Sequence, residues 1–164
     1  MAGNRSARKR GKNMKFGKFL GILALSMTLW AADPAVGTWK LNAAKSKYTP
    51  GPAPKSATVT YEETGDGIKR TGESVDADGK TTSFTYTAKY DGKDYAVSGS
   101  DLYDTIAPKR INDQTVQATL KKSGTVVHTA RRVVSKDGKV MTITMTGKNA
   151  KGEKVHNVAV YDKQ

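Results

Sequence analysis

The feature that most constrains this chain is a series of short turn signals that recur at regular intervals from residue 56 onward. They fall at 65–67, 76–79, 91–92, 112–113, 122–124 and 136–138. Glycine, aspartate and asparagine dominate these turns, and such residues adopt the tight backbone conformations of β-hairpins at little steric cost. The segments between the turns carry almost no helical signal. The sequence therefore predicts consecutive β-hairpins.

The segments themselves alternate between two faces with a period of two residues. In the clearest of them, Phe84, Tyr86 and Ala88 share one face, and threonines and Lys89 occupy the other. This alternation is typical of a strand with one buried face. Together with a first strand at about 36–42 and a last strand at about 154–162, the pattern predicts about ten strands.

Two all-β architectures can be built from consecutive hairpins. A sandwich needs longer crossing connections, and the proline-rich stretch 43–55 is the one that is long enough. An up-and-down antiparallel barrel needs none, and it leaves no free sheet edge. We therefore expect an all-β fold, a closed barrel of about ten strands.

The first 32 residues differ from the rest in charge and hydropathy. They hold seven basic groups and no acidic group, so the net charge of +13 falls to about +6 for residues 33–164. A basic segment, an apolar run at 19–30 and the small residues Ala31 and Ala32 are typical of a secretory signal peptide. We expect a signal peptide over 1–32, with Met14 as a possible start, and one barrel domain over 33–164. The mature protein is expected to be periplasmic or secreted.

The composition argues against several functions. The chain has no cysteine, which excludes disulfides and thiol chemistry. Much of the remaining positive charge is scattered as single lysines in turns, and no nucleic-acid-reading motif accompanies it. His128 and His156 each stand alone in a predicted strand, and no serine has the partners of a catalytic triad. We expect no metal, no cofactor, no nucleic-acid partner, no catalysis and no stable membrane span after signal cleavage. The expected oligomeric state is a monomer.

Both ends of the barrel domain resemble those of a known superfamily. Gly37-Thr38-Trp39-Lys40-Leu41 and Val160-Tyr161-Asp162-Lys163 are similar to the first and last strands of the calycins, which include lipocalins and fatty-acid-binding proteins. The Trp-Lys-Leu-Asn start and Tyr-Asp-Lys finish also resemble a group of small secreted bacterial proteins of unassigned function. The resemblance implies that Trp39 packs across the closed end of the barrel.

The fatty-acid-binding branch holds a ligand carboxylate with an Arg-x-Tyr motif on the last strand and an arginine on an earlier strand. Tyr161 matches the tyrosine, and Ala159 stands where the motif has arginine. Counting forward from Gly124 places the second arginine at Arg131, and counting back from Asp137-Gly138 places it at Arg132. Because successive side chains of a strand point to opposite faces, the two assignments place the arginine on opposite faces of the sheet. The proline-rich stretch also replaces the two-helix lid of that branch.

Two functions remain open. The first is an exported lipocalin-like barrel that binds a small, largely apolar or amphiphilic ligand, because barrels of this size can enclose one ligand. Its candidate ligand-binding residues are Trp39, Phe84, Tyr86, Arg131, Arg132 and Tyr161. In the calycin register, Arg131 is expected to face inward near Tyr161 as a polar anchor. The alternative is a ligand-free structural or interaction module of the cell envelope that uses its Thr- and Lys-rich outer surface.

Overall fold

A computed structural model describes residues 1, 3 and 32–164 of the 164-residue chain. The predicted signal peptide therefore falls, apart from residues 1, 3 and 32, outside the described part. Residues 31–164 separate from residues 1–30 as a compact unit of their own. This unit contains all of the strands described below.

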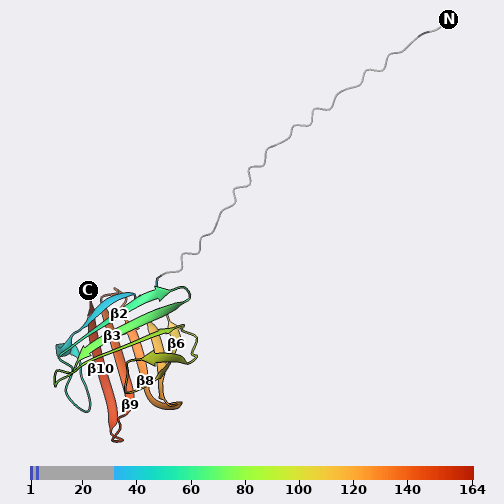
Figure 1. The fold of residues 1–164 in the computed structure, drawn as a ribbon. Coiled ribbons are helices and arrows are strands. Elements are labelled where there is room, and N and C mark those ends of the chain that lie inside the picture. The colour runs from blue at the N-terminus through green and yellow to red at the C-terminus, as the bar shows by residue number, and fades with distance from the viewer. Residues whose placement is uncertain (2, 4–31) are drawn as a thin grey trace. The chain divides into compact units, whose positions relative to one another are not determined.

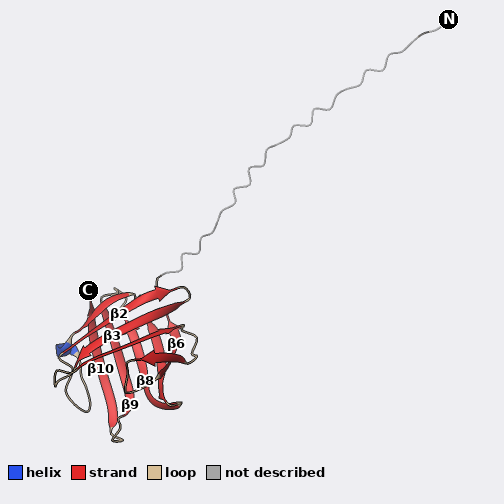
Figure 2. Ribbon diagram, viewed as in Figure 1, coloured by secondary structure: helices blue, strands red, loops and turns tan. Residues whose placement is uncertain are grey.

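Ten antiparallel strands form the unit, and they pair in sequence order around a closed barrel (Figures 1 and 2). The strands are β1 (Gly37–Leu41), β2 (Ser56–Thr64), β3 (Gly67–Val75), β4 (Thr81–Ala88), β5 (Tyr95–Ser98), β6 (Thr105–Asn112), β7 (Thr115–Lys122), β8 (Thr125–Val134), β9 (Val140–Lys148) and β10 (Lys154–Lys163). Closure occurs at β1, where Trp39 lies opposite Val59 of β2 and Lys163 of β10. Figure 1 shows β2 and β3 running at a steep angle to β9 and β10, as strand tilt in a closed barrel requires.

The alternation of the strand residues sets which side chains face the interior. Ala57, Val59 and Tyr61 of β2 are buried, and the threonines between them are more exposed. The same alternation holds for Tyr86 and Ala88 of β4. The predicted all-β, up-and-down antiparallel barrel of about ten strands is confirmed.

The connection between β1 and β2 contains one short 3₁₀ turn, η1 (Ala43–Lys45), in place of a helix pair. Asn42 caps this turn by accepting a hydrogen bond from the backbone N–H of Lys45 (3.2 Å). The chain then pairs Lys47 with Val158 of β10 and continues through the prolines to β2. The prediction of a barrel without the two-helix lid is therefore confirmed.

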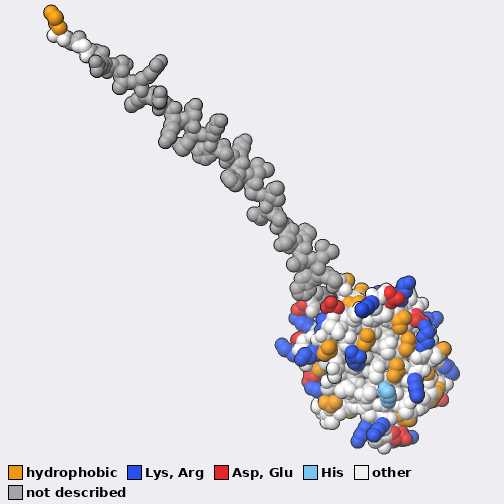
Figure 3. Space-filling view, turned by 180° about the vertical axis from the view of Figure 1, so that it is seen from behind, with side chains coloured by type: hydrophobic (Ala, Val, Ile, Leu, Met, Phe, Trp, Pro, Cys, Tyr) orange, Lys and Arg blue, Asp and Glu red, His pale blue; other side chains and the backbone are white. Residues whose placement is uncertain are grey.

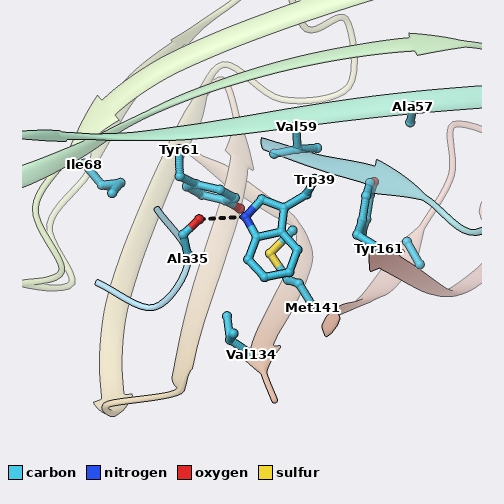
Figure 4. Close-up of a cluster of buried hydrophobic side chains, with 10 residues drawn as sticks. Ala35, Trp39, Ala57, Val59, Tyr61, Ile68, Val134, Met141 and Tyr161 are labelled. Carbon is cyan, nitrogen blue, oxygen red and sulfur yellow. Dashed lines mark hydrogen bonds between the residues drawn. The ribbon is translucent and has the colours of Figure 1, made fainter. Parts of the chain in front are cut away.

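A cluster of buried side chains around Trp39 fills one end of the barrel (Figure 4). Trp39 is fully buried, and its indole Nε1 donates a hydrogen bond to the backbone carbonyl of Ala35 (2.7 Å). Ile68, Val134 and Met141 complete the packing from β3, β8 and β9. Ala35 and Val36, which lie just before β1, are thereby held against this end of the barrel.

The outer surface is polar, and its charges are dispersed. Figure 3 shows single basic side chains over the visible face of the barrel, with acidic side chains among them and hydrophobic side chains in small separate patches. Exposed pairs such as Lys69–Glu62 and Lys121–Asp94 are typical of a solvated sheet surface, where each contributes little stability. None of the helical structure in the described residues is long and apolar enough to span a membrane.

Candidate functional site

A cavity of about 290 Å³ lies inside the barrel, beside the cluster around Trp39. Most of its wall is apolar and aromatic. The lining includes Val59, Tyr61, Phe84, Tyr86, Tyr90, Tyr103, Ile106, Val116, Leu120, Ile143, Met145, Ala159 and Tyr161. An apolar chamber with few polar groups is the usual form of a small-molecule site, and this volume lies at the small end of the range for such sites.

The cavity opens at the end of the barrel opposite Trp39. Its lining passes from fully buried residues to Tyr48, Pro54, Glu73 and Leu102, which are partly or largely exposed. Leu102 is 60% exposed, although it is apolar. These residues come from the β1–β2 connection, the end of β3 and the β5–β6 loop. The proline-rich connection therefore forms part of the cavity mouth.

Arg70 of β3 is the main polar group in the cavity wall. Its side chain reaches inward because Arg70 shares the buried face of β3 with Ile68 and Gly72. The residue is 9% exposed, and its Nε donates a hydrogen bond to the Tyr61 hydroxyl (3.0 Å). Among the described residues it has no acidic partner within ion-pair distance. An arginine stays charged when buried, so Arg70 supplies an unbalanced positive charge to the cavity.

Aromatic rings hold the Arg70 guanidinium in place. Its central carbon lies 4.3 Å from the centroid of the Phe84 ring and 5.7 Å from that of Tyr61. Phe84 can cross β3 because Gly72 lies opposite it, and a Cβ atom at Gly72 would come within 2.8 Å of the ring. The Phe84 and Tyr103 rings also pack in a T-shaped arrangement, with their centroids 6.2 Å apart. Stacking on both rings favours the cation and restricts its position.

Arg132 of β8 is the second buried arginine in the wall, and it has an acidic partner. Its Nη2 lies 3.4 Å from Oδ1 of Asp33, and Nη2 of Arg110 donates to Oδ2 of Asp33 at 2.6 Å. The guanidinium of Arg132 also lies over the rings of Tyr61 (4.8 Å) and Tyr90 (5.3 Å). Arg70, Arg132, Tyr61 and Tyr90 together are called the cavity floor below.

The surroundings of Asp33 keep its carboxylate ionised. Burial alone would raise the pKa of Asp33, but the charge of Arg132, the backbone N–H of Ala35 and the hydrogen bond from Arg110 together lower it below its usual value. Burial also raises the pKa of Tyr86, Tyr90 and Tyr103 above that of free tyrosine, so these phenols are neutral. Among the described residues, the cavity floor therefore presents neutral tyrosine hydroxyls beside the charged Arg70 and Arg132, with the Asp33 carboxylate in contact with Arg132.

The structure corrects the expectation that Arg131 faces inward. Arg131 is exposed on the outer face of β8, beside Gln117 of β7 and Thr144 of β9, and Arg132 faces the cavity. A β-bulge causes the difference, because Leu120 pairs with His128 and the next residue, Lys121, pairs with Val126. The extra residue, Val127, shifts any count that starts from Gly124 by one position. The count from Asp137-Gly138 crosses no bulge and reaches Arg132.

The other predicted site residues divide into two groups. Phe84, Tyr86 and Tyr161 line the cavity, as does Arg132. Trp39 is absent from the lining and belongs to the cluster that closes the end of the barrel. Its position matches the packing role that the calycin resemblance implies. Whether any of these residues binds a ligand stays a prediction.

Sequence reasoning missed Arg70 and Asp33. A signal for Arg70 existed, because its place between Ile68 and Gly72 puts a charge on the buried face of an alternating strand. Asp33 had no such signal. Its partners lie 77 and 99 residues away in sequence, and only closure of the barrel brings them together.

Comparison with known proteins identifies the type of fold. No protein-family model and no curated protein sequence matches the chain. Among solved structures, it is similar to the zebrafish ileal bile acid-binding protein in complex with cholic acid, with a TM-score of 0.52 and 14% identity over 80% of this chain and 99% of that one. It is also similar to Rv2717c from M. tuberculosis, with a TM-score of 0.50 and 13% identity over 80% of this chain and 93% of that one. Together with the closed ten-strand barrel, these similarities show that the chain has a calycin-like fold.

Proposed function

We propose that this protein is a binding protein for one small amphiphile with a single anionic group. The observation that carries the proposal is Arg70, a buried guanidinium without an acidic partner among the described residues, which faces a largely apolar cavity. Leaving a charge buried and unpaired is costly, so an anion from outside the chain would relieve that cost. The aromatic wall would receive the apolar part of the same molecule.

The shape of the cavity supports an orientation for the ligand. Arg70 lies at the cavity floor, and Leu102, Tyr48 and Pro54 surround the mouth. An anionic group would therefore enter first and the apolar chain would point toward the mouth. The small volume favours a single chain or a compact ring system over a lipid with two chains. The similar zebrafish structure contains cholic acid, which supports an amphiphilic ligand by analogy of fold alone.

The proposal is tested by titrating the full chain with decanoate and with 1-decanol, which have the same chain length, in a calorimeter. We expect saturable binding of one decanoate per chain and markedly weaker binding of the neutral alcohol. Native mass spectrometry of protein purified from its own host should also show a co-purifying anionic amphiphile. Saturable binding of neither compound, together with a ligand-free purified protein, would contradict the proposal and favour the structural or interaction module.

We further propose that the mature protein acts outside the cytoplasm. The support is the sequence of residues 1–32, with its basic segment, apolar run and small residues before Asp33. Amino-terminal sequencing of the protein from periplasmic and culture fractions should give a start at Ala32 or Asp33. A mature chain that still carries residues 19–30 would overturn this proposal.

A further inference from the structure

Asp33 lies next to the cavity floor and contacts one of its two arginines. The Asp33 carboxylate is not part of the cavity lining. It contacts Arg132, and Arg132 does line the cavity. The side chains of both residues are less than a tenth exposed, so solvent screens their interaction only weakly. The third member of the group, Arg110, has a side chain that is 35% exposed and lies nearer to solvent.

The buried charges at the floor leave an excess of one positive charge. Counted over the side chains that are at most about a tenth exposed, Arg70 and Arg132 each contribute one positive charge and Asp33 contributes one negative charge. Arg110 also contacts Asp33, but its side chain is 35% exposed and solvent screens its charge. The two guanidinium groups lie 5.7 and 4.8 Å from the centroid of the same Tyr61 ring, so both stand next to one region of the cavity. Arg132 shares the Asp33 carboxylate with Arg110, whereas no acidic group among the described residues offsets the charge of Arg70.

We propose that Asp33 is a specificity-determining residue that makes the cavity select monoanionic over dianionic head groups by neutralising Arg132. This inference rests on the proposed function, because it concerns the ligand held at Arg70. A carboxylate would balance the one charge in excess. A phosphate monoester dianion would bring a second negative charge that finds no free cation, and burying that charge unpaired is unfavourable.

The test compares decanoate with decyl phosphate, titrated into the full chain and its Asp33→Asn variant. At about pH 8.5 the phosphate monoester is a dianion, since its second pKa is about 6. The unmodified chain should bind decanoate at least as tightly as decyl phosphate. Asp33→Asn should tighten decyl phosphate binding by about tenfold, because Arg132 is released, and change decanoate binding much less. Asp33→Glu, which keeps the negative charge, should restore the original preference.

Asp66→Asn is the matched control. It removes one negative charge from an exposed side chain that pairs with Lys89 on the surface, so it should leave the preference between the two ligands unchanged. Equal tightening of both ligands by Asp33→Asn, or the same tightening by Asp66→Asn, would overturn the inference. Either outcome would mean that the Asp33→Asn variant acts through a general charge effect or a change in packing, and not through the release of Arg132.

A second variant covers the case in which Asp33→Asn does not fold. Combining Asp33→Asn with Arg132→Gln removes both members of the ion pair and should keep the original preference for decanoate. A preference for decyl phosphate in this double variant would contradict the inference. Failure of the proposed function and failure of this inference give different results. An unmodified chain that binds neither ligand overturns both of them. A chain that binds decanoate, with an unchanged preference in Asp33→Asn, overturns the inference alone.

Discussion

Replacing Arg70 with methionine is expected to weaken decanoate binding by about thirtyfold or more, since losing one partner of a buried charge pair costs about 2 kcal/mol or more. Binding of 1-decanol should change little, because methionine keeps the apolar bulk of the side chain. The free energy of unfolding should stay the same or rise, because Arg70 has no acidic partner among the described residues in the empty barrel. Calorimetry and urea unfolding measure the two effects separately.

Arg131→Met is the matched control for this experiment. It makes the same substitution on the outer face of β8, next to the inward-facing Arg132. Affinity for both compounds should match that of the unmodified chain. If Arg131→Met weakens decanoate binding as much as Arg70→Met does, the anion does not bind in the cavity, and the assignment of Arg70 is wrong.

Replacing Trp39 with alanine is expected to lower the free energy of unfolding by about 3–5 kcal/mol, the usual cost of deleting a large buried aromatic side chain. Trp39 is fully buried, and it packs the end of the barrel at which β1 joins β2 and β10. Most domains are stable by only about 5–15 kcal/mol, so this loss would remove a large share of the stability. Urea unfolding followed by circular dichroism measures it.

Trp39→Phe separates the structural role from a role in binding. Phenylalanine fills part of the space but leaves the carbonyl of Ala35 without the indole donor, so a smaller loss of about 1–3 kcal/mol is expected. Decanoate affinity should be unchanged, because Trp39 does not line the cavity. A large loss of affinity in Trp39→Phe, with stability nearly retained, would instead place Trp39 in the ligand site.

The barrel was predictable because its determinants are local. Alternation with a period of two and the turn residues between strands can both be read over a few residues, and sequential hairpins close without crossing connections. A proline such as Pro108 is usually confined to an edge strand or a β-bulge, because it has no N–H to donate to a neighbouring strand. The structure keeps Pro108 inside β6, opposite Ala118, with a register shift further along at Arg110 and Asn112. The proline lies where β6 has little pairing with the short β5.

The site was less predictable because its determinants act at a distance. The face of Arg131 and Arg132 depended on one bulged residue, and nothing in the sequence of β8 marks Val127 as that residue. The pairing of Asp33 with Arg110 and Arg132 arises only when the chain closes. The resemblance to the fatty-acid-binding branch implies a site at Tyr161 and at Arg131 or Arg132, whereas Arg70, which has no acidic partner among the described residues, lies on β3. The alternation of buried and exposed residues along β3 predicts that Arg70 faces the interior.

The central claim is that an anionic group binds at Arg70 inside the barrel, and a crystal structure of the full chain with decanoate tests it most directly. We predict continuous density for one decanoate in the cavity, with a carboxylate oxygen about 2.7–2.9 Å from an Arg70 guanidinium nitrogen. The hydrocarbon chain should extend toward Leu102 at the mouth. Decanoate bound only on the outer surface, or a carboxylate held by Arg131 while the cavity stays empty, would contradict the account.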